Sequence, residues 1–128
     1  MLARLAPIAI LLAAACSDDA GWSRDELPAN ARVALKVTGT SAPECDASFL
    51  ASLASVTVHG LDTDAPTVVV VAGDDACAWD GNAIACELTH GPAGTMRIDF
   101  GGEAARLAGL GASACAYDYA ITAVAAIP

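Results

Sequence analysis

The chain has 128 residues, of which 55% are hydrophobic, and its fifteen Asp and Glu outnumber six Lys and Arg, which gives a formal net charge of −9 at pH 7. This excess of negative charge argues against nucleic acid and anionic lipid headgroups as partners, because both are negatively charged themselves. The length is that of one small domain. No apolar segment after residues 1–15 is long enough to span a bilayer core, which needs roughly 20 residues.

Residues 1–15 have the pattern of an export signal. One basic residue, Arg4, precedes an apolar run over 5–15, and small residues end this run immediately before Cys16. The run has the length of the apolar region of a signal peptide and is too short to cross a membrane. We therefore predict that residues 1–15 are a signal peptide and that the protein is exported.

The sequence Leu11-Leu12-Ala13-Ala14-Ala15-Cys16 resembles a bacterial lipobox. The resemblance implies that Cys16 carries a diacylglycerol, becomes the N-terminus after cleavage and anchors the protein to a bacterial membrane. Two or more acyl chains on one residue hold a protein on a membrane stably. Ser17 follows this cysteine, and in this position the chain resembles lipoproteins that are sorted to the outer membrane. The alternative is ordinary cleavage after Ala15, which would leave an unmodified thiol on Cys16.

Residues 16–30 predict an acidic tether between the lipid and the domain. They contain scattered charges, Gly21 and Pro28, and they show no sustained periodicity. Such a composition is typical of a linker. Trp22 could dock either on the domain or on the membrane interface. The folded domain is expected to span residues 31–128.

Short strands follow from residue 31 onward. Apolar residues alternate over 33–38, which predicts a half-buried strand. Residues 49–53 could form a helical turn, whereas 56–58 favour a strand. Further strands are expected in a β-branched run over 67–73 and in alternating segments over 94–102 and 115–128.

Residues 103–110 contain helix-forming residues, but the segment is short and glycines lie near its end. A single helical turn and an irregular crossing both remain open there. The strands recur at roughly ten-residue spacing and are broken by Gly, Pro and Asp, a pattern that favours an all-β fold. We expect a small antiparallel β-sandwich of about seven strands, with or without one short helical turn.

The segment from Cys77 to Cys86 predicts a hairpin closed by a disulfide. Its midpoint falls at Gly81-Asn82, and both residues tolerate the positive φ that a two-residue turn requires. With this turn Cys77 lies opposite Cys86 in a non-hydrogen-bonded pair, where side chains are closest and a disulfide fits. Cys45 is then left to pair with Cys115, which ties an early loop to the last strand.

An odd number of cysteines in an exported chain needs an explanation. The two predicted disulfides account for four of the five cysteines and leave Cys16 over. Cys16 is also the residue that the lipobox resemblance marks for lipidation. The cysteine count therefore agrees with a lipid anchor.

The two histidines, His59 and His90, each precede Gly and are expected at strand ends or turns. A zinc site that joined them to Cys77 and Cys86 would have an unusual ligand spacing, and the cysteines of an exported chain are oxidised. Nucleophilic catalysis needs a nucleophile, a base and an orienting group brought together. We assign no catalytic residue, no resident metal and no cofactor from the sequence.

Two pairs of aspartates, Asp62 with Asp64 and Asp74 with Asp75, are candidates for other chemistry. Carboxylates at such spacing could bind Ca²⁺ or act in acid–base catalysis. Neither pair resembles a complete calcium loop, and Asp is common in turns. Calcium binding at these four residues is the alternative to a role in turns.

Several short motifs together resemble a carboxypeptidase-regulatory-like domain: Cys45-Asp46-Ala47, Cys77–Gly81, Gly94–Phe100, and Cys115 before a last strand that ends at Ile127-Pro128. The resemblance covers most of residues 31–128. It implies the transthyretin-like (prealbumin-like) β-sandwich that occurs in many bacterial lipoproteins. It also implies a binding or structural module without a catalytic zinc site.

Three functions follow in order of preference. The first is a lipid-anchored, non-catalytic β-sandwich of the cell envelope, which meets the membrane through its lipid and binds or scaffolds an envelope protein or a glycan. The second is a calcium-dependent ligand-binding or adhesion module that uses the aspartate loops. The third is a small hydrolase that depends on His59 or His90. Nucleic acid is not an expected partner.

Overall fold

The computed structural model describes residues 21–90, 93–109 and 115–128. Its strands are β3 (Asn30–Thr40), β4 (Ser55–His59), β5 (Thr67–Val69), β6 (Asp75–Asp80), β7 (Ala83–Leu88), β8 (Gly94–Asp99), β9 (Ala104–Ala108) and β10 (Tyr117–Ala126). The same ranges contain the short 3-10 helices η2 (Arg24–Glu26), η3 (Pro43–Ala47) and η4 (Phe49–Ser52). In this part of the chain no helix is long and apolar enough to cross a membrane.

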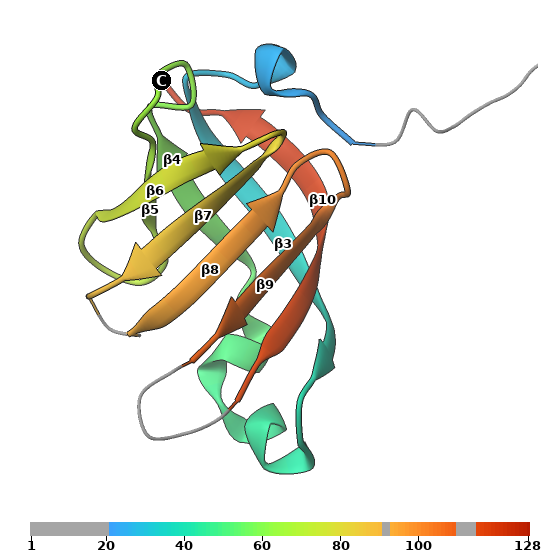
Figure 1. Ribbon diagram of the computed structural model, residues 1–128. Helices are drawn as coiled ribbons and strands as arrows, with labels where there is room; N and C mark the ends of the chain where they lie inside the picture. Colours follow the sequence, from blue (N-terminus) through green and yellow to red (C-terminus); the bar gives the residue numbers. More distant parts are fainter. Residues whose placement is uncertain (1–20, 91–92, 110–114) are drawn as a thin grey trace, which may run out of the picture.

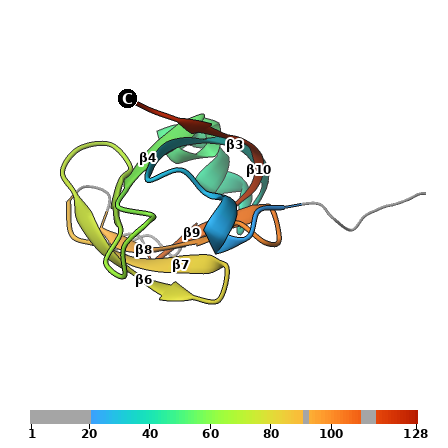
Figure 2. The same cartoon turned by 90° about the horizontal axis from the view of Figure 1, so that it is seen from above.

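The eight strands form one closed antiparallel barrel (Figure 1). Each strand pairs with its neighbours in the chain, and β10 pairs with β3 to complete the ring, as the view from above shows (Figure 2). The predicted all-β, antiparallel class is confirmed, but the expected β-sandwich of about seven strands is wrong. The reason is that β3 and β10 pair along almost their whole length, so the sheet closes on itself and keeps no open edge.

The additional strand comes from residues 103–110, for which a helical turn or an irregular crossing was expected. Ala105 and Leu107 point into the barrel and Arg106 points outward, which is the two-residue period of a strand. β9 also pairs with β8 on one side and β10 on the other. This pairing outweighs the helix preference of its Ala and Leu residues.

Most other local expectations are confirmed. The alternation over 33–38 lies within β3, and the alternation over 94–102 forms β8, with Met96 and Ile98 buried. The ambiguous stretch contains both predicted structures, because the turn of η4 is followed by β4. In the β-branched run the strand is short and covers Thr67–Val69 alone.

Inward-pointing side chains fill the barrel. The largest of those that are fully buried are Tyr117, Tyr119, Phe100, Leu61, Ile84 and Met96. The Tyr119 hydroxyl donates a hydrogen bond of 2.6 Å to the Leu50 carbonyl, and burial raises the pKa of Tyr119 to about 12. Because side chains occupy the interior, the outer surface and the two ends offer more room for a ligand.

Successive connections lie alternately at the two ends of the barrel, because neighbouring strands are antiparallel. We call one end, with residues 60–66, 81–82 and 100–103, the strap end. We call the other, with η3, η4 and residues 70–74, the disulfide end. In Figure 1 the strap end is at the top, beside the blue η2, and the disulfide end is at the bottom, with the green η3 and η4.

Residues 21–29, which we call the strap, lie across the strap end. Three of their backbone N–H groups donate to the barrel at 2.9 Å: Gly21 to Glu103 Oε2, Trp22 to the Phe100 carbonyl and Arg24 to Asn82 Oδ1. Trp22 also packs against the core, so it docks on the domain. The described part of the expected tether is therefore fixed to the barrel.

Candidate functional site

The predicted hairpin and its disulfide are confirmed. β6 and β7 pair in the expected register, with Trp79 opposite Ile84 and Cys77 opposite Cys86. Cys77 and Cys86 form a disulfide inside the barrel, where both residues are buried. Their sulfur atoms are bonded to each other. The two cysteines are therefore not thiolate ligands for the zinc site considered as an alternative.

The second predicted disulfide, Cys45–Cys115, is also present and links residues 70 positions apart. It joins η3 to the segment that leads into β10, and Cys45 is buried. The two disulfides use four of the five cysteines of the chain. The fifth, Cys16, lies outside the described residues.

The four candidate calcium ligands are not brought together. Asp62 and Asp64 lie in the connection from β4 to β5 at the strap end, whereas Asp74 and Asp75 lie at the disulfide end. Among residues 21–90, 93–109 and 115–128 no group of three or more His, Cys, Asp or Glu side chains is arranged to hold a metal ion.

Asp75 has a structural environment instead. Its carboxylate is buried and accepts hydrogen bonds from the Thr89 N–H at 2.9 Å and the Thr89 hydroxyl at 2.8 Å. His90 Nδ1 lies 2.9 Å from the same carboxylate oxygen. The hydrogen bond from the Thr89 backbone and those from the His90 and Thr89 side chains lower the pKa of Asp75 to about 2. This cluster connects the start of β6 to the residues that directly follow β7.

The two histidines occupy opposite ends of the barrel. His59 ends β4 at the strap end, and its Nδ1 lies 3.2 Å from Asn30 Oδ1. His90 follows β7 at the disulfide end. The structure therefore does not combine them in one site.

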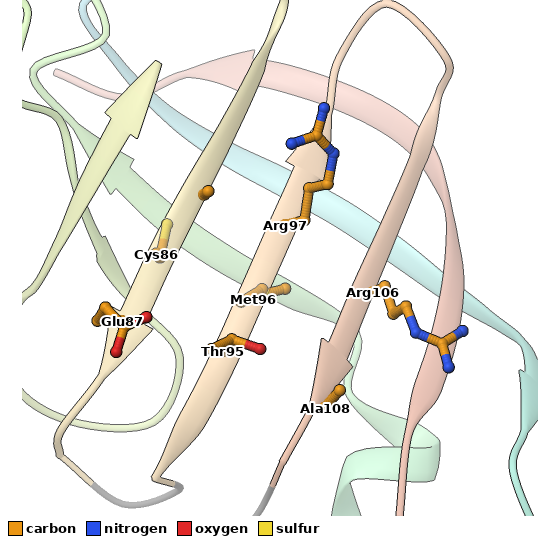
Figure 3. A pocket seen from close by; sticks show the side chains of 8 residues that line it. Cys86, Glu87, Thr95, Met96, Arg97, Arg106 and Ala108 are labelled. Carbon is orange, nitrogen blue, oxygen red and sulfur yellow. The ribbon is translucent and has the colours of Figure 1, made fainter. Parts of the chain in front are cut away.

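A concave surface lies on the outer face of β7, β8 and β9, with a volume of about 350 Å³ (Figure 3). Small side chains, Ala85 and Ala108, leave this surface open. Arg97 of β8 and Arg106 of β9 are direct cross-strand partners and both border the concavity. We call the concavity and its two arginines the arginine face.

The two guanidinium groups of the arginine face point in different directions, as Figure 3 shows. Arg97 Nη1 lies 3.0 Å from Asp80 Oδ2, and Arg106 Nη1 lies 2.7 Å from Asp118 Oδ1. The side chains of Arg97 and Arg106 remain 48% and 55% exposed, so both are accessible from solvent in spite of their ion pairs. Two exposed planar cations beside an open concavity can bind carboxylates or other anions through paired hydrogen bonds.

Sequence reasoning missed the arginine face. The alternation over 94–102 predicts a strand that contains Arg97, but Arg106 lies in the segment 103–110, for which the sequence left a helical turn or a crossing open. The signal that could have found the pair is the period of two in Ala105, Arg106 and Leu107, which predicts an outward Arg106 on a strand.

Comparison with protein-family models, with curated proteins and with solved structures gives no match. The fold and covalent links themselves define the class of the described chain: a closed, eight-stranded antiparallel barrel with a packed interior and two disulfides. The resemblances to a lipobox and to a carboxypeptidase-regulatory-like domain stay predictions from sequence.

Proposed function

We propose that this protein is a lipid-anchored, non-catalytic module of the bacterial cell envelope, with a binding or structural role. The observation that carries the proposal is the pairing of the cysteines. Disulfides persist in oxidising compartments outside the cytoplasm. Cys45–Cys115 and Cys77–Cys86 leave Cys16 as the remaining cysteine, and it follows the lipobox-like sequence.

The intact mass of the protein extracted from membranes tests the anchor. The expected mass is that of the chain from Cys16 onward with two or three acyl chains and two disulfides. Cys16→Ala should move the protein from the membrane fraction to the soluble fraction. An intact mass without acyl chains, or membrane association that survives C16A, would contradict the proposal.

For the binding role, the arginine face is the candidate surface, and we propose that it takes an anionic ligand such as an acidic glycan. The chain has few cations, yet two of them lie on facing positions of neighbouring strands. Like charges directly opposite each other destabilise a sheet. The pair is compensated in the free protein by Asp80 and Asp118, and an anionic ligand would compensate it further.

Titration calorimetry with oligogalacturonate, against a neutral galactose oligomer, tests this surface. We expect binding of the acidic oligomer alone, weakened by salt because exposed charges are screened. Arg97→Gln with Arg106→Gln should lower the affinity at least tenfold. The matched control is Arg32→Gln, because Arg32 is an exposed arginine on β3 rather than on β7–β9. Equal losses in both variants would mean that the arginine face has no special role.

A further inference from the structure

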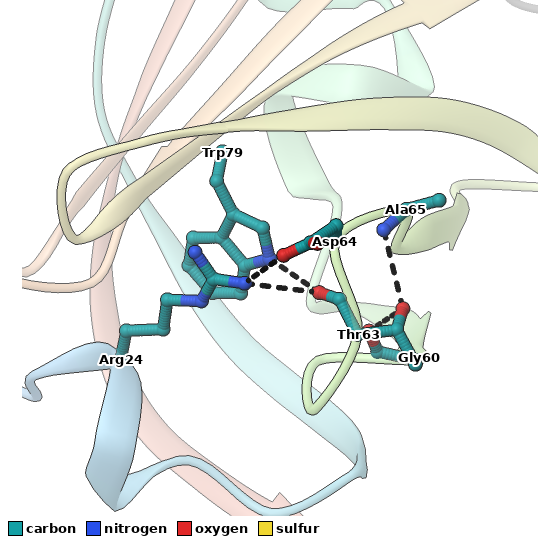
Figure 4. A network of polar contacts seen from close by, with 6 residues as sticks. All are labelled: Arg24, Gly60, Thr63, Asp64, Ala65 and Trp79. Atoms are coloured by element: carbon teal, nitrogen blue, oxygen red, sulfur yellow. Dashed lines mark hydrogen bonds and ion pairs between the residues drawn. The ribbon is translucent and has the colours of Figure 1, made fainter.

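The strap is held at several points besides the three backbone N–H groups that donate to the barrel. Arg24 stacks on Trp79, with its guanidinium carbon 4.3 Å from the ring centroid (Figure 4). Arg24 Nη2 also lies 3.0 Å from Asp64 Oδ1 and donates to the Thr63 carbonyl at 3.2 Å. The Trp79 indole N–H donates to the same carbonyl at 2.8 Å. These contacts join the strap to β6 and to the connection from β4 to β5.

The attachment begins at Gly21, the first described residue. Gly21 has φ of +93°, a backbone conformation that side chains rarely adopt. A Cβ at this position would overlap with the Gly101 carbonyl oxygen, so the strap backbone lies directly on the turn between β8 and β9. The chain is therefore in close contact with the strap end from Gly21 onward.

From this geometry we infer that the strap holds the strap end of the barrel next to a phospholipid bilayer and directs the disulfide end away from it. The inference rests on the proposed lipidation of Cys16. Five residue steps separate Cys16 from Gly21, and a fully extended chain covers at most about 3.5 Å per step, or about 18 Å in all. An anchor of this reach, attached to a fixed strap, keeps the strap end at the membrane.

The lipid anchor, and not electrostatic attraction to the headgroups, holds the strap end at the bilayer. The strap end carries many carboxylates: Asp25, Glu26, Asp62, Asp64, Asp80, Asp99 and Glu103. These groups disfavour contact with anionic lipid and prevent deep insertion into headgroups. The strap end therefore comes closest to a bilayer with neutral headgroups. Anionic lipid should increase the distance between the strap end and the headgroups, up to the limit that the anchor sets.

The two tryptophans of the chain report on this arrangement, because Trp22 belongs to the strap and Trp79 contacts it. The lipidated protein, with its acyl chains verified by mass, is reconstituted into phosphatidylcholine vesicles that contain dansyl-labelled phosphatidylethanolamine. Energy transfer from tryptophan to dansyl measures proximity to the headgroups. We expect strong transfer, and weaker transfer when phosphatidylglycerol replaces part of the phosphatidylcholine at low salt.

Two variants provide the comparison. A Gly/Ser insert of about twelve residues between Ala20 and Gly21 leaves the strap intact but adds about 20 Å of flexible reach, and it should lower the transfer at least threefold. Trp22→Phe with Trp79→Phe and Phe49→Trp moves the reporter to the disulfide end, where Phe49 is 59% exposed. Its transfer should also fall at least threefold, with the fold verified by disulfide content and melting.

The outcomes separate the two proposals. Equal transfer from both ends, in protein whose acyl chains are verified, would overturn the orientation and leave the anchor standing. Unchanged transfer after the insertion would likewise overturn it. A mass without acyl chains would refute the anchor and, with it, this placement at a membrane.

Discussion

At the disulfide end a covalent bond joins Cys45 of η3 to Cys115 ahead of β10, whereas at the strap end hydrogen bonds, one ion pair and one cation–π contact hold residues 21–29. Both devices tie a segment outside the barrel to strands that are distant in sequence. They differ in what can undo them. A reductant acts on the disulfide end, whereas a denaturant acts on the strap and salt weakens only its exposed ion pair.

The difference shows how a small barrel divides its stability. The Cys45–Cys115 bond encloses β4 to β9, so it restricts most of the unfolded chain. The strap encloses nothing covalently and acts only through contacts of the folded state. We therefore expect the disulfide end to control global stability and the strap end to open locally at lower cost.

Removal of the long disulfide should give the largest effect. Cys45→Ala with Cys115→Ala is expected to lower the free energy of unfolding by about 4 kcal/mol, because the bond closes a long loop. Cys77→Ala with Cys86→Ala is the matched control and should cost about 2.5 kcal/mol, since its loop is short. Urea unfolding of the two variants measures the difference. Equal costs would show that loop length does not govern the stability of this barrel.

One added methyl group at Gly21 should disrupt the contact between the strap and the turn that joins β8 to β9. Gly21→Ala should lower the free energy of unfolding by more than about 2 kcal/mol, because it adds a backbone clash to the strain of positive φ. Gly81→Ala is the control: its φ is +65° and no atom lies within 4 Å of the added Cβ, so strain alone should cost about 1 kcal/mol. Hydrogen exchange at the Trp22 and Arg24 amides should accelerate only in G21A. Equal effects in both variants would argue against tight strap docking.

A third comparison uses pH at the disulfide end. The hydrogen bonds from Thr89 and His90 lower the pKa of Asp75 from 3.8 to about 2. The folded state thus favours the ionised carboxylate, so this stabilisation is complete above about pH 5 and is lost as the pH falls toward 2. Asp75→Asn should be less stable at neutral pH and should lose the part of the acid dependence that this carboxylate provides. The matched control is Asp74→Asn, because Asp74 is exposed. This variant should lose stability between pH 5 and 2 to the same extent as the unsubstituted protein.

The sequence allowed local pairing to be predicted because short-range geometry determines it. Gly81-Asn82 placed Cys77 opposite Cys86, and the structure has this register. Elimination then assigned Cys45 to Cys115. The closure of the barrel could not be predicted in the same way, because the pairing of β3 with β10 depends on the accumulated twist and curvature of every strand between them.

The strap and the arginine face show the same limit. Residues 21–29 have the composition of a linker, and their partners Asn82, Phe100 and Glu103 are far away in the sequence. Arg97 and Arg106 become neighbours only once β9 is recognised as a strand. The strap was missed because its partners lie far away in the sequence, whereas the arginine face was missed because one strand of its own hairpin, β9, was not recognised.

The smallest effect should come from the Arg24 side chain, where the ion pair can be separated from the other contacts of this residue. Arg24→Gln removes the stacking on Trp79, the hydrogen bond to the Thr63 carbonyl and the ion pair with Asp64, and it should cost about 1 kcal/mol in unfolding free energy. Asp64→Asn removes the ion pair alone. Because the Asp64 side chain is fully exposed, that variant should cost clearly less than R24Q and lose its effect at high salt. If D64N cost as much as R24Q, the ion pair would dominate, and the stacking on Trp79 and the hydrogen bond to Thr63 would contribute little. If R24Q is the more costly variant and its effect persists in high salt, the stacking on Trp79 and the hydrogen bond to Thr63 hold the Arg24 side chain, and ionic strength does not release them.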